Sequence, residues 1–372
     1  MPVVVLFIIF VVLLVIAVPV SITLGITSVL PSVFDPSFTV GAKYLIRAMF
    51  GGLDSFPLLA VPMFVLSGII MAKGGISKKL FDVFAYFLGK FTAGMPCAVI
   101  VTCLFYGAIS GSAPATVAAV GSMTIPILTT LGYDITFSTA IVAVAGGLGV
   151  IIPPSIPFIM YGMASGASVS DLFLAGIIPG LMIGALLMVY AIYHCKRYGE
   201  DKEKIHSEVQ MLHDKGLLKV LKESFFALLS PVIILGCIYT GVASPTEAAV
   251  ISVFYALIIS LFVYKSIKIR DIWPILVEAI RTFTPILFIL AASTAFSRVL
   301  TLMQVPQTVS EFILNNFHSP VAILLIINIF LLIVGMVMDT TPAILILTPI
   351  LLPIVEAIGM NPIQFGVIMV VN

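Results

Sequence analysis

Charge is scarce in this chain of 372 residues. Asp, Glu, Lys and Arg together make up 9% of it, whereas 61% of the residues are hydrophobic. A soluble globular protein carries nearer a quarter charged residues, so this composition excludes that class. The formal net charge of +1 includes no basic stripe, and nucleic acid is therefore not expected as a partner. The composition is typical of a polytopic membrane protein in contact with the lipid bilayer.

The sequence also lacks the motifs of catalysis and of nucleotide binding. HExxH and GxSxG patterns are missing, and so is the GxxxxGK[ST] loop that would bind ATP. The four cysteines have no CxxC spacing and fall in or beside apolar runs, so we expect neither a disulfide framework nor a transition-metal site. We expect no enzyme. Any driving energy would then come from an ion gradient or from another subunit.

Apolar runs of about 20 residues predict transmembrane helices, because that length crosses the hydrocarbon core of a bilayer. Strict alternation, the pattern of barrel strands, is missing, so the predicted fold is all-α. The first run lacks a basic start and is predicted to be a membrane helix rather than a signal peptide. The predicted spans are 3–30, 56–73, 171–193, 224–242, 246–264, 274–302 and 320–336.

One segment occurs twice, as GAISGSAPATVAAVGSMTIPIL from Gly107 and as GMVMDTTPAILILTPILLPI from Gly335. Gly107 and Gly335 lie 228 residues apart, and Pro114 and Pro342 keep the same spacing. Each copy is apolar except for a short polar break before a proline. Polar breaks at membrane depth, repeated in two halves, are typical of the substrate and ion sites of secondary transporters.

The first break predicts a re-entrant hairpin over 95–130 with its tip at Ser110 to Pro114. Pro114 suits the first turn of a helix, where its missing N–H costs nothing. Hydroxyls and carbonyls of Ser110, Gly111 and Ser112 would bind a hard cation, and the helix N-terminus at Ala113 and Pro114 would favour an anionic substrate. A Ser/Gly helix kink or close-packing motif is the alternative.

The second break predicts a matching hairpin over about 320–357. Asp339, Thr340 and Thr341 supply a carboxylate and two hydroxyls at the equivalent place, and they are the predicted ligands of a second sodium site. An ionisable residue at membrane depth is costly unless it has a partner or a function. Asp339 would also make sense as a simple N-cap.

A broken helix is predicted over 136–165, because Gly146 to Pro157 (GGLGVIIPPSIP) holds three glycines and three prolines. Prolines remove backbone donors and free earlier carbonyls. Unwound carbonyls around Gly147 and Gly149, together with Pro153, would face the first tip and complete a first sodium site. A proline kink without a ligand is the alternative.

Charges in the connecting segments predict the orientation. The long hydrophilic segment 196–223 is rich in lysine, which predicts a cytoplasmic location. The connector after 56–73 carries four lysines, whereas Gln304 to Pro320 has Glu311 and no Lys or Arg. The two repeats are therefore predicted to face opposite ways, as in inverted-repeat transporters. Two further stretches, 38–50 and 78–88, are predicted to be interfacial helices, with ordinary loops as the alternative.

Three remaining polar features have weaker assignments. SPTEAA, from Ser244, has the pattern of a capping box with Pro at the first helical position. Arg298 and Glu278 lie within or near the apolar run 274–302 and would either bind a substrate carboxylate or pair elsewhere. Further low-ranked substrate contacts are Ala113, Pro114, Ser155 and Thr341.

These assignments divide the chain into four parts. An N-terminal scaffold helix and interfacial arm cover 1–55, the first inverted repeat covers 56–170, further scaffold helices cover 171–270, and the second repeat covers 271–372. The repeat spacing pairs Ala145 with Asn372, so we expect the second broken helix to continue beyond Asn372.

Four stretches closely resemble the large membrane subunit of tripartite ATP-independent periplasmic (TRAP) transporters, in collinear order over nearly the whole chain. They are AISGSAPATVAAVGSMTIP, GGLGVIIPPSIPFIMYG, ASPTEAAV and MDTTPAILILTPILLP. The resemblance implies an elevator-type transporter in the bacterial inner membrane that works with a small membrane subunit and a periplasmic substrate-binding protein. It also implies import of a small carboxylate, such as a C4-dicarboxylate or sialic acid, driven by Na⁺. The first sodium site would lie between the Ser110 to Ser112 tip and the 147–154 break, and the second beside Asp339 to Thr341.

Other functions remain open from the residues. A sodium/dicarboxylate carrier or anion antiporter of the same broad fold would work without a binding protein. An ion channel would show pore-ring motifs in place of an inverted duplication. A membrane enzyme fits worst, for lack of histidines and acids at membrane depth.

Overall fold

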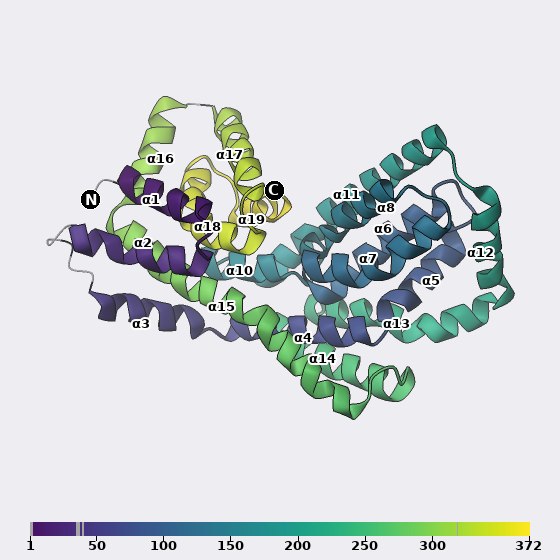
Figure 1. Cartoon of the computed structure of the whole chain (residues 1–372). Coiled ribbons are helices and arrows are strands. Elements are labelled where there is room, and N and C mark those ends of the chain that lie inside the picture. Colours follow the sequence, from purple (N-terminus) through teal and green to yellow (C-terminus); the bar gives the residue numbers. More distant parts are fainter. Residues whose placement is uncertain (1–2, 35–37, 39–40, 318) are drawn as a thin grey trace. The chain divides into compact units, whose positions relative to one another are not determined.

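All regular elements in the described part of the chain are helices, as the all-α prediction requires (Figure 1). The computed structural model describes residues 3–34, 38, 41–317 and 319–372. Among these residues, seven helices are long and apolar enough to cross a membrane, and the bent pair Ile135–Ile151 with Ile156–Ser165 brings the number to up to eight. The protein is thus an all-α multi-pass membrane protein.

The chain forms two compact units. One contains Met1–Leu59, Pro157–Leu172 and Ile280–Asn372, and the other contains Ala60–Ile156 and Phe173–Ala279. The first tip and the break at 152–155 therefore belong to the second of these units, and the Asp339 tip belongs to the first.

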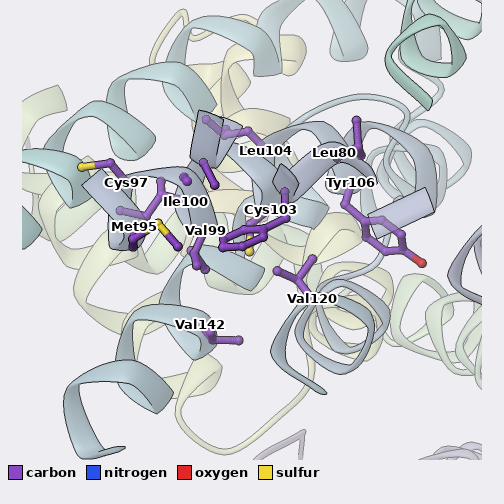
Figure 2. Packing of buried hydrophobic residues seen from close by; sticks show 14 of the residues in the cluster. Leu80, Met95, Cys97, Val99, Ile100, Cys103, Leu104, Tyr106, Val120 and Val142 are labelled. Carbon is purple, nitrogen blue, oxygen red and sulfur yellow. The ribbon is translucent and has the colours of Figure 1, made fainter. Parts of the chain in front are cut away.

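The unit built around Ala60–Ile156 holds the first hairpin in its core. Helix α6 packs against α5, α7 and α8, while α4 packs along α14. Figure 2 shows the apolar cluster that joins these helices, with Leu80 from α5, Cys103 and Tyr106 from α6, and Val120 and Val142 from α7 and α8. The helices are α4 (Ala60–Lys73), α5 (Ile76–Leu88), α6 (Gly94–Ser110), α7 (Ala113–Thr130), α8 (Ile135–Gly146), α9 (Leu148–Ile151), most of α11 (Val169–Tyr198), α12 (Lys202–Asp214), α13 (Leu217–Tyr239) and α14 (Pro245–Ile258), which a π-helical turn at Ile259–Val263 extends.

The other unit gathers the N-terminal helices and the second repeat. Helix α18 contacts α16, α17 and α19, and α2 contacts α1 and α3. Phe10 of α1 stacks on Phe296 of α15 with ring centroids 5.8 Å apart. The elements are α1 (Val3–Val15), α2 (Val20–Phe34), α3 (Ala42–Leu53), the 3-10 turn Phe56–Leu59, α16 (Val305–Asn316), α17 (Pro320–Gly335), α18 (Thr340–Ala357) and α19 (Pro362–Val371). Two further helices, α10 (Ile156–Ser165) and α15 (Ile272–Leu302, preceded by the 3-10 turn Ile269–Asp271), each begin in one unit and end in the other.

The prediction of one membrane helix over 3–30 is wrong. The chain forms α1 and α2, of 13 and 15 residues, joined by a turn in which Ala17 has a φ of 65°. Pro19 at the end of this turn lacks the N–H that a continuous helix would need. Each helix is shorter than the roughly 20 residues of a full span.

The polar stretches are more helical than the sequence suggests. The hydrophilic segment 196–223 contains α12, whose Ile205, Val209 and Leu212 are buried. The predicted interfacial stretches correspond to α5 and to α3, although residues 39–40 of the latter stretch lie outside the described residues.

The capping box at Ser244 is confirmed. The Glu247 N–H donates to the Ser244 hydroxyl, and the Ser244 N–H donates to the Glu247 carboxylate at 2.7 Å. Pro245 follows at the first position of α14. These contacts account for the SPTEAA motif as a structural helix start.

Candidate functional site

The first tip is a sharp turn between α6 and α7. Gly111 ends α6 in the left-handed region with a φ of 62°, which favours glycine because other residues meet a steric clash there. Ser112 is extended and serves as the N-cap of α7, with Pro114 in its first turn. Helix α6 has 17 residues and is therefore about 25 Å long, less than the roughly 30 Å of a hydrocarbon core. These features fit a hairpin whose tip lies inside the protein.

Hydroxyl groups meet at this tip. Ser110 is 1% exposed, and its Oγ lies 2.9 Å from Oγ1 of Thr116, which is fully buried. Thr116 Oγ1 also donates to the Ser112 carbonyl at 2.9 Å. The tip thus holds two hydroxyls and a carbonyl of three residues within hydrogen-bond distance of one another.

The broken helix opens later than the glycines predict. The chain stays helical through α9, is non-helical over 152–155, and resumes as α10 after a bend of 42°. Pro153 and Pro154 have no N–H, so the carbonyls of Gly149 and Val150 lose their helical donors. The Ser155 hydroxyl donates to the Val150 carbonyl in their place. The prediction of an unwound stretch around Gly147 to Gly149 is therefore off by a few residues. The helix ends at Ile151, just before the two prolines.

The structure brings the first tip and this break together. A methyl group built on Gly107 would lie 2.6 Å from Cα of Gly149, and one built on Gly149 would lie 3.0 Å from the Ser112 carbonyl oxygen. On the other side of the tip, the Gly111 carbonyl accepts from the Ile156 N–H at 3.1 Å. Only glycine allows these backbones to approach so closely.

The other predicted first-site and substrate residues differ in how closely they join this cluster. The Gly147 carbonyl already accepts from the Val150 N–H in a turn, and Pro153 lies in the non-helical stretch. The Pro154 carbonyl oxygen lies closer to the tip, 2.7 Å from a methyl group built on Gly111. Ser155 is buried, Ala113 is half-buried, and Pro114 is exposed on the first turn of α7.

The chemistry of the first tip is that of neutral oxygen. Its polar groups are the hydroxyls of Ser110 and Thr116 and the carbonyl of Ser112, packed beside the backbone of Gly149, and no ionisable side chain is among them. Carbonyl and hydroxyl oxygens replace the hydration shell of a hard cation such as Na⁺. A doubly charged ion would lack the carboxylates that such ions usually receive from proteins.

The second tip, in the other unit, has a carboxylate. Asp339 is the N-cap of α18, yet its side chain makes no capping hydrogen bond and the residue is exposed. Thr340 and Thr341 form the first turn of α18, with Thr341 buried and Pro342 next in the same turn. Asp339 therefore occupies the N-cap position, as the alternative to a sodium ligand states, but its side chain does not cap the helix.

The two repeats share a packing detail. A methyl group built on Gly335 would lie 2.7 Å from the carbonyl oxygen of Asn372. Gly335 is the repeat equivalent of Gly107, and Asn372 is the equivalent of Ala145, four residues before Gly149. In both repeats, the glycine before the tip thus lets the backbone of the next helix approach.

Glu278 and Arg298, both in the apolar run 274–302, differ in their contacts. Glu278 forms an ion pair with Lys73 at the end of α4. Of its two predicted roles, substrate binding or pairing with another residue, the structure shows the second. Arg298 is exposed on α15.

Thr116 is the site residue that the sequence analysis missed. The sequence feature that points to it is its position four residues after Ser112. Residues i and i+4 lie on the same face of a helix, so the Thr116 hydroxyl can reach the tip. That spacing was visible in SAPAT but also describes many threonines that only bond their own helix.

Comparison with known proteins agrees with the fold. The family described as "Tripartite ATP-independent periplasmic transporter, DctM component" matches residues 7–372. The isethionate TRAP transporter permease protein DctMQ of Oleidesulfovibrio alaskensis is 43% identical over 371 residues, which cover all of this chain and 57% of that protein. The C4-dicarboxylate TRAP transporter large permease protein DctM of Pseudomonas aeruginosa is 39% identical, over 87% of this chain and 74% of that protein.

A third relative carries a different substrate name. The sialic acid TRAP transporter large permease protein SiaM of Vibrio cholerae is 34% identical, over 90% of this chain and 77% of that protein. The chain thus spans between about half and three quarters of the length of these relatives. With the family matched across almost the whole chain, the protein belongs to the DctM component family of TRAP transporters, the large permease subunits, and is not an enzyme.

Proposed function

We propose that this large permease subunit imports a small organic anion together with Na⁺ across the bacterial inner membrane. The observation that carries the proposal is the cluster of neutral oxygens where the α6–α7 tip meets the broken helix at Gly149. Such oxygens suit a monovalent hard cation. A second cation would bind beside Asp339, Thr340 and Thr341.

The substrate is an anion, which the start of a helix at either tip would favour. Each tip is followed by a helix N-terminus, whose unpaired N–H groups and dipole favour negative charge. The names of the relatives support a small carboxylate, such as a C4-dicarboxylate or sialic acid, and one names isethionate, which carries a sulfonate. The chain's partners are then a small membrane subunit and a periplasmic binding protein that delivers the anion.

The coupling follows from differential binding. Na⁺ orders the two tips, and the part of the protein that carries them slides against a scaffold in an elevator motion. A ligand biases such a movement only when its affinity differs between the two states. Ordered tips therefore bind the anion, and loss of Na⁺ to the cytoplasm releases it.

The test is reconstitution of this chain with its small membrane subunit and binding protein in proteoliposomes. Radiolabelled C4-dicarboxylate, sialic acid and isethionate are supplied in turn, with an inward gradient of Na⁺ or of K⁺. One anion is expected to accumulate only with Na⁺ and only with the binding protein. Equal uptake with K⁺ would overturn sodium coupling, and full uptake without the binding protein would favour the carrier alternative.

Two variants connect this transport to the tips. Ser110→Ala and Asp339→Ala are expected to raise the Na⁺ concentration that gives half-maximal uptake, because each removes a side-chain oxygen from one tip. Unchanged Na⁺ dependence in both variants would contradict the assigned sites.

A further inference from the structure

We propose that Thr116 is a positioning residue that fixes the Ser110 hydroxyl and the Ser112 carbonyl in the arrangement that binds Na⁺ at the first tip. This inference rests on the proposed sodium coupling and assigns a residue to it. Thr116 is fully buried and lies on α7, one helical turn after Ser112.

The number of hydroxyl protons determines the direction of these hydrogen bonds. Three oxygen pairs lie within bonding distance, namely Ser110 Oγ to Thr116 Oγ1 at 2.9 Å, Thr116 Oγ1 to the Ser112 carbonyl at 2.9 Å, and Ser110 Oγ to that carbonyl at 3.3 Å. Two hydroxyls have only two protons to donate. The arrangement that uses both short distances has Ser110 donating to Thr116, and Thr116 donating to the Ser112 carbonyl.

This relay leaves a lone pair free on the Ser110 oxygen. That oxygen directs its proton toward Thr116 and accepts the Ser112 N–H at 3.4 Å, so one of its two lone pairs stays available for a cation. The Ser112 carbonyl accepts both the N–H and the hydroxyl of Thr116, at 3.0 and 2.9 Å, which fixes its orientation at the tip. Without the Thr116 hydroxyl, Ser110 would donate to the Ser112 carbonyl directly and bring both groups out of this arrangement.

The same side chain also sets the distance to the broken helix. A methyl group built on Gly149 would lie 2.4 Å from Thr116 Oγ1, so this oxygen contacts the Gly149 backbone closely. Thr116 therefore touches both the tip and the backbone of the broken helix at Gly149. A residue that links the two can order them before the cation arrives.

The second repeat lacks this relay. The repeat equivalent of Thr116 is Ile344, which is buried and has no hydroxyl. The second tip has Asp339 as a charged ligand, and it does not depend on a relay of hydroxyls. Thr116 is therefore specific to the first site, whose oxygens are all neutral.

The test measures binding of ²²Na⁺ to the purified full chain. Thr116→Val keeps the shape of the side chain and removes the hydroxyl, and it is expected to weaken Na⁺ binding at one site by about tenfold, the value of one net hydrogen bond. Thr116→Ser keeps the hydroxyl and is expected to bind Na⁺ like the wild type. Measuring both in an Asp339→Ala background isolates the first site.

Thr124→Val is the matched control. Thr124 lies on the same helix, is fully buried, and donates to the Val120 carbonyl at 2.8 Å, as Thr116 does to Ser112. Each valine variant loses one such bond, and Thr116→Val also loses the bond from Ser110, so it is expected to unfold at a somewhat lower temperature than Thr124→Val without Na⁺. Only Thr116→Val is expected to change Na⁺ affinity.

The outcomes separate this inference from the proposed function. If the wild type binds Na⁺ and Thr116→Val binds it equally well, the positioning role is wrong while sodium coupling stands. The same conclusion follows if Thr124→Val or Thr116→Ser weakens binding as much as Thr116→Val. If the wild type binds no Na⁺, both the coupling and the role of Thr116 fail.

Discussion

Two glycine backbones in contact determine how closely the first hairpin and the broken helix pack. Gly107 lies inside α6, where alanine would normally favour the helix. A methyl group at this position would lie 2.6 Å from Cα of Gly149 and 3.1 Å from its nitrogen. Backbone atoms cannot rotate away as the end of a side chain can, so the steric cost exceeds the gain in helix propensity.

Gly107→Ala is therefore expected to destabilise the protein. Overpacking of a tight contact costs about 1–3 kcal/mol. The expected result is a lower unfolding temperature in detergent, together with weaker protection by Na⁺, because α9 and its Gly149 carbonyl are pushed away from the tip.

Gly236→Ala serves as the control for Gly107→Ala. Gly236 lies in α13, and a methyl group there meets nothing within 4 Å. This variant is expected to stabilise the protein by about 0.5–1 kcal/mol, the ordinary gain of alanine over glycine in a helix. Equal effects of both substitutions would show that the contact between Gly107 and Gly149 is looser than described.

At the scale of elements, Glu200 joins three segments that are distant in sequence. Its carboxylate accepts the Ala93 N–H at 3.0 Å and the Tyr133 hydroxyl at 2.5 Å. Ala93 precedes α6, Tyr133 lies in the turn between α7 and α8, and Glu200 follows α11. A negative group at the N-terminus of α6 also suits the helix dipole. Burial and this hydrogen bond both raise the pKa of Tyr133, which keeps its hydroxyl a donor.

Glu200→Gln is expected to loosen the base of the hairpin. An amide that accepts from Tyr133 turns its NH₂ group toward the Ala93 N–H, so two donors face each other. Loss of a charged hydrogen bond costs about 2 kcal/mol. Hydrogen–deuterium exchange is expected to speed up in the first turn of α6, which is the region to measure.

Glu203→Gln provides the comparison for Glu200→Gln. Glu203 is exposed in the first turn of α12, only three residues away. The Glu203→Gln substitution is expected to leave hydrogen–deuterium exchange in α6 unchanged. If Glu200→Gln also left exchange there unchanged, its link to Ala93 would not stabilise the hairpin.

Features set by neighbouring residues were predictable from the sequence. Ser244 and Glu247 form their capping box within one turn, and Pro114 and Pro342 start helices by the local geometry of proline. The late opening of the broken helix at 152–155 follows from Pro153 and Pro154, but the glycines before them suggested an earlier start. Pro19 was less informative, because an apolar run on both sides of a proline also occurs in kinked membrane helices.

Features set by tertiary contacts were not predictable. Thr116 and Glu200 look like many other threonines and glutamates until the fold brings partners to them. Ala93 and Tyr133 lie far from Glu200 along the chain, and no spacing in the sequence connects them. The ligand types at the first tip could thus be named from SGSAP, while their arrangement required the packing of α6, α7 and α9.

At the scale of the whole molecule, the charges of the two repeat connectors predict opposite sides of the membrane. The connector after α4 has lysines at 73, 78, 79 and 90, whereas the connector after α15 has Glu311 and no basic residue. Cytoplasmic segments carry an excess of Lys and Arg. An inverted pair of repeats would place these connectors on opposite faces of the membrane, as in inverted-repeat transporters.

Cysteine labelling in intact cells tests this orientation. In a background without Cys97, Cys103, Cys195 and Cys237, Lys78→Cys and Gln307→Cys each introduce one exposed thiol into the two connectors. A membrane-impermeant maleimide added outside is expected to label Cys at 307 and to label Cys at 78 only after the cells are opened. Ser207→Cys, in the lysine-rich segment 196–223, should behave like the variant at 78. Labelling of 78 and 307 from the same side would mean that the repeats run in parallel, and an elevator with inverted tips could not then operate.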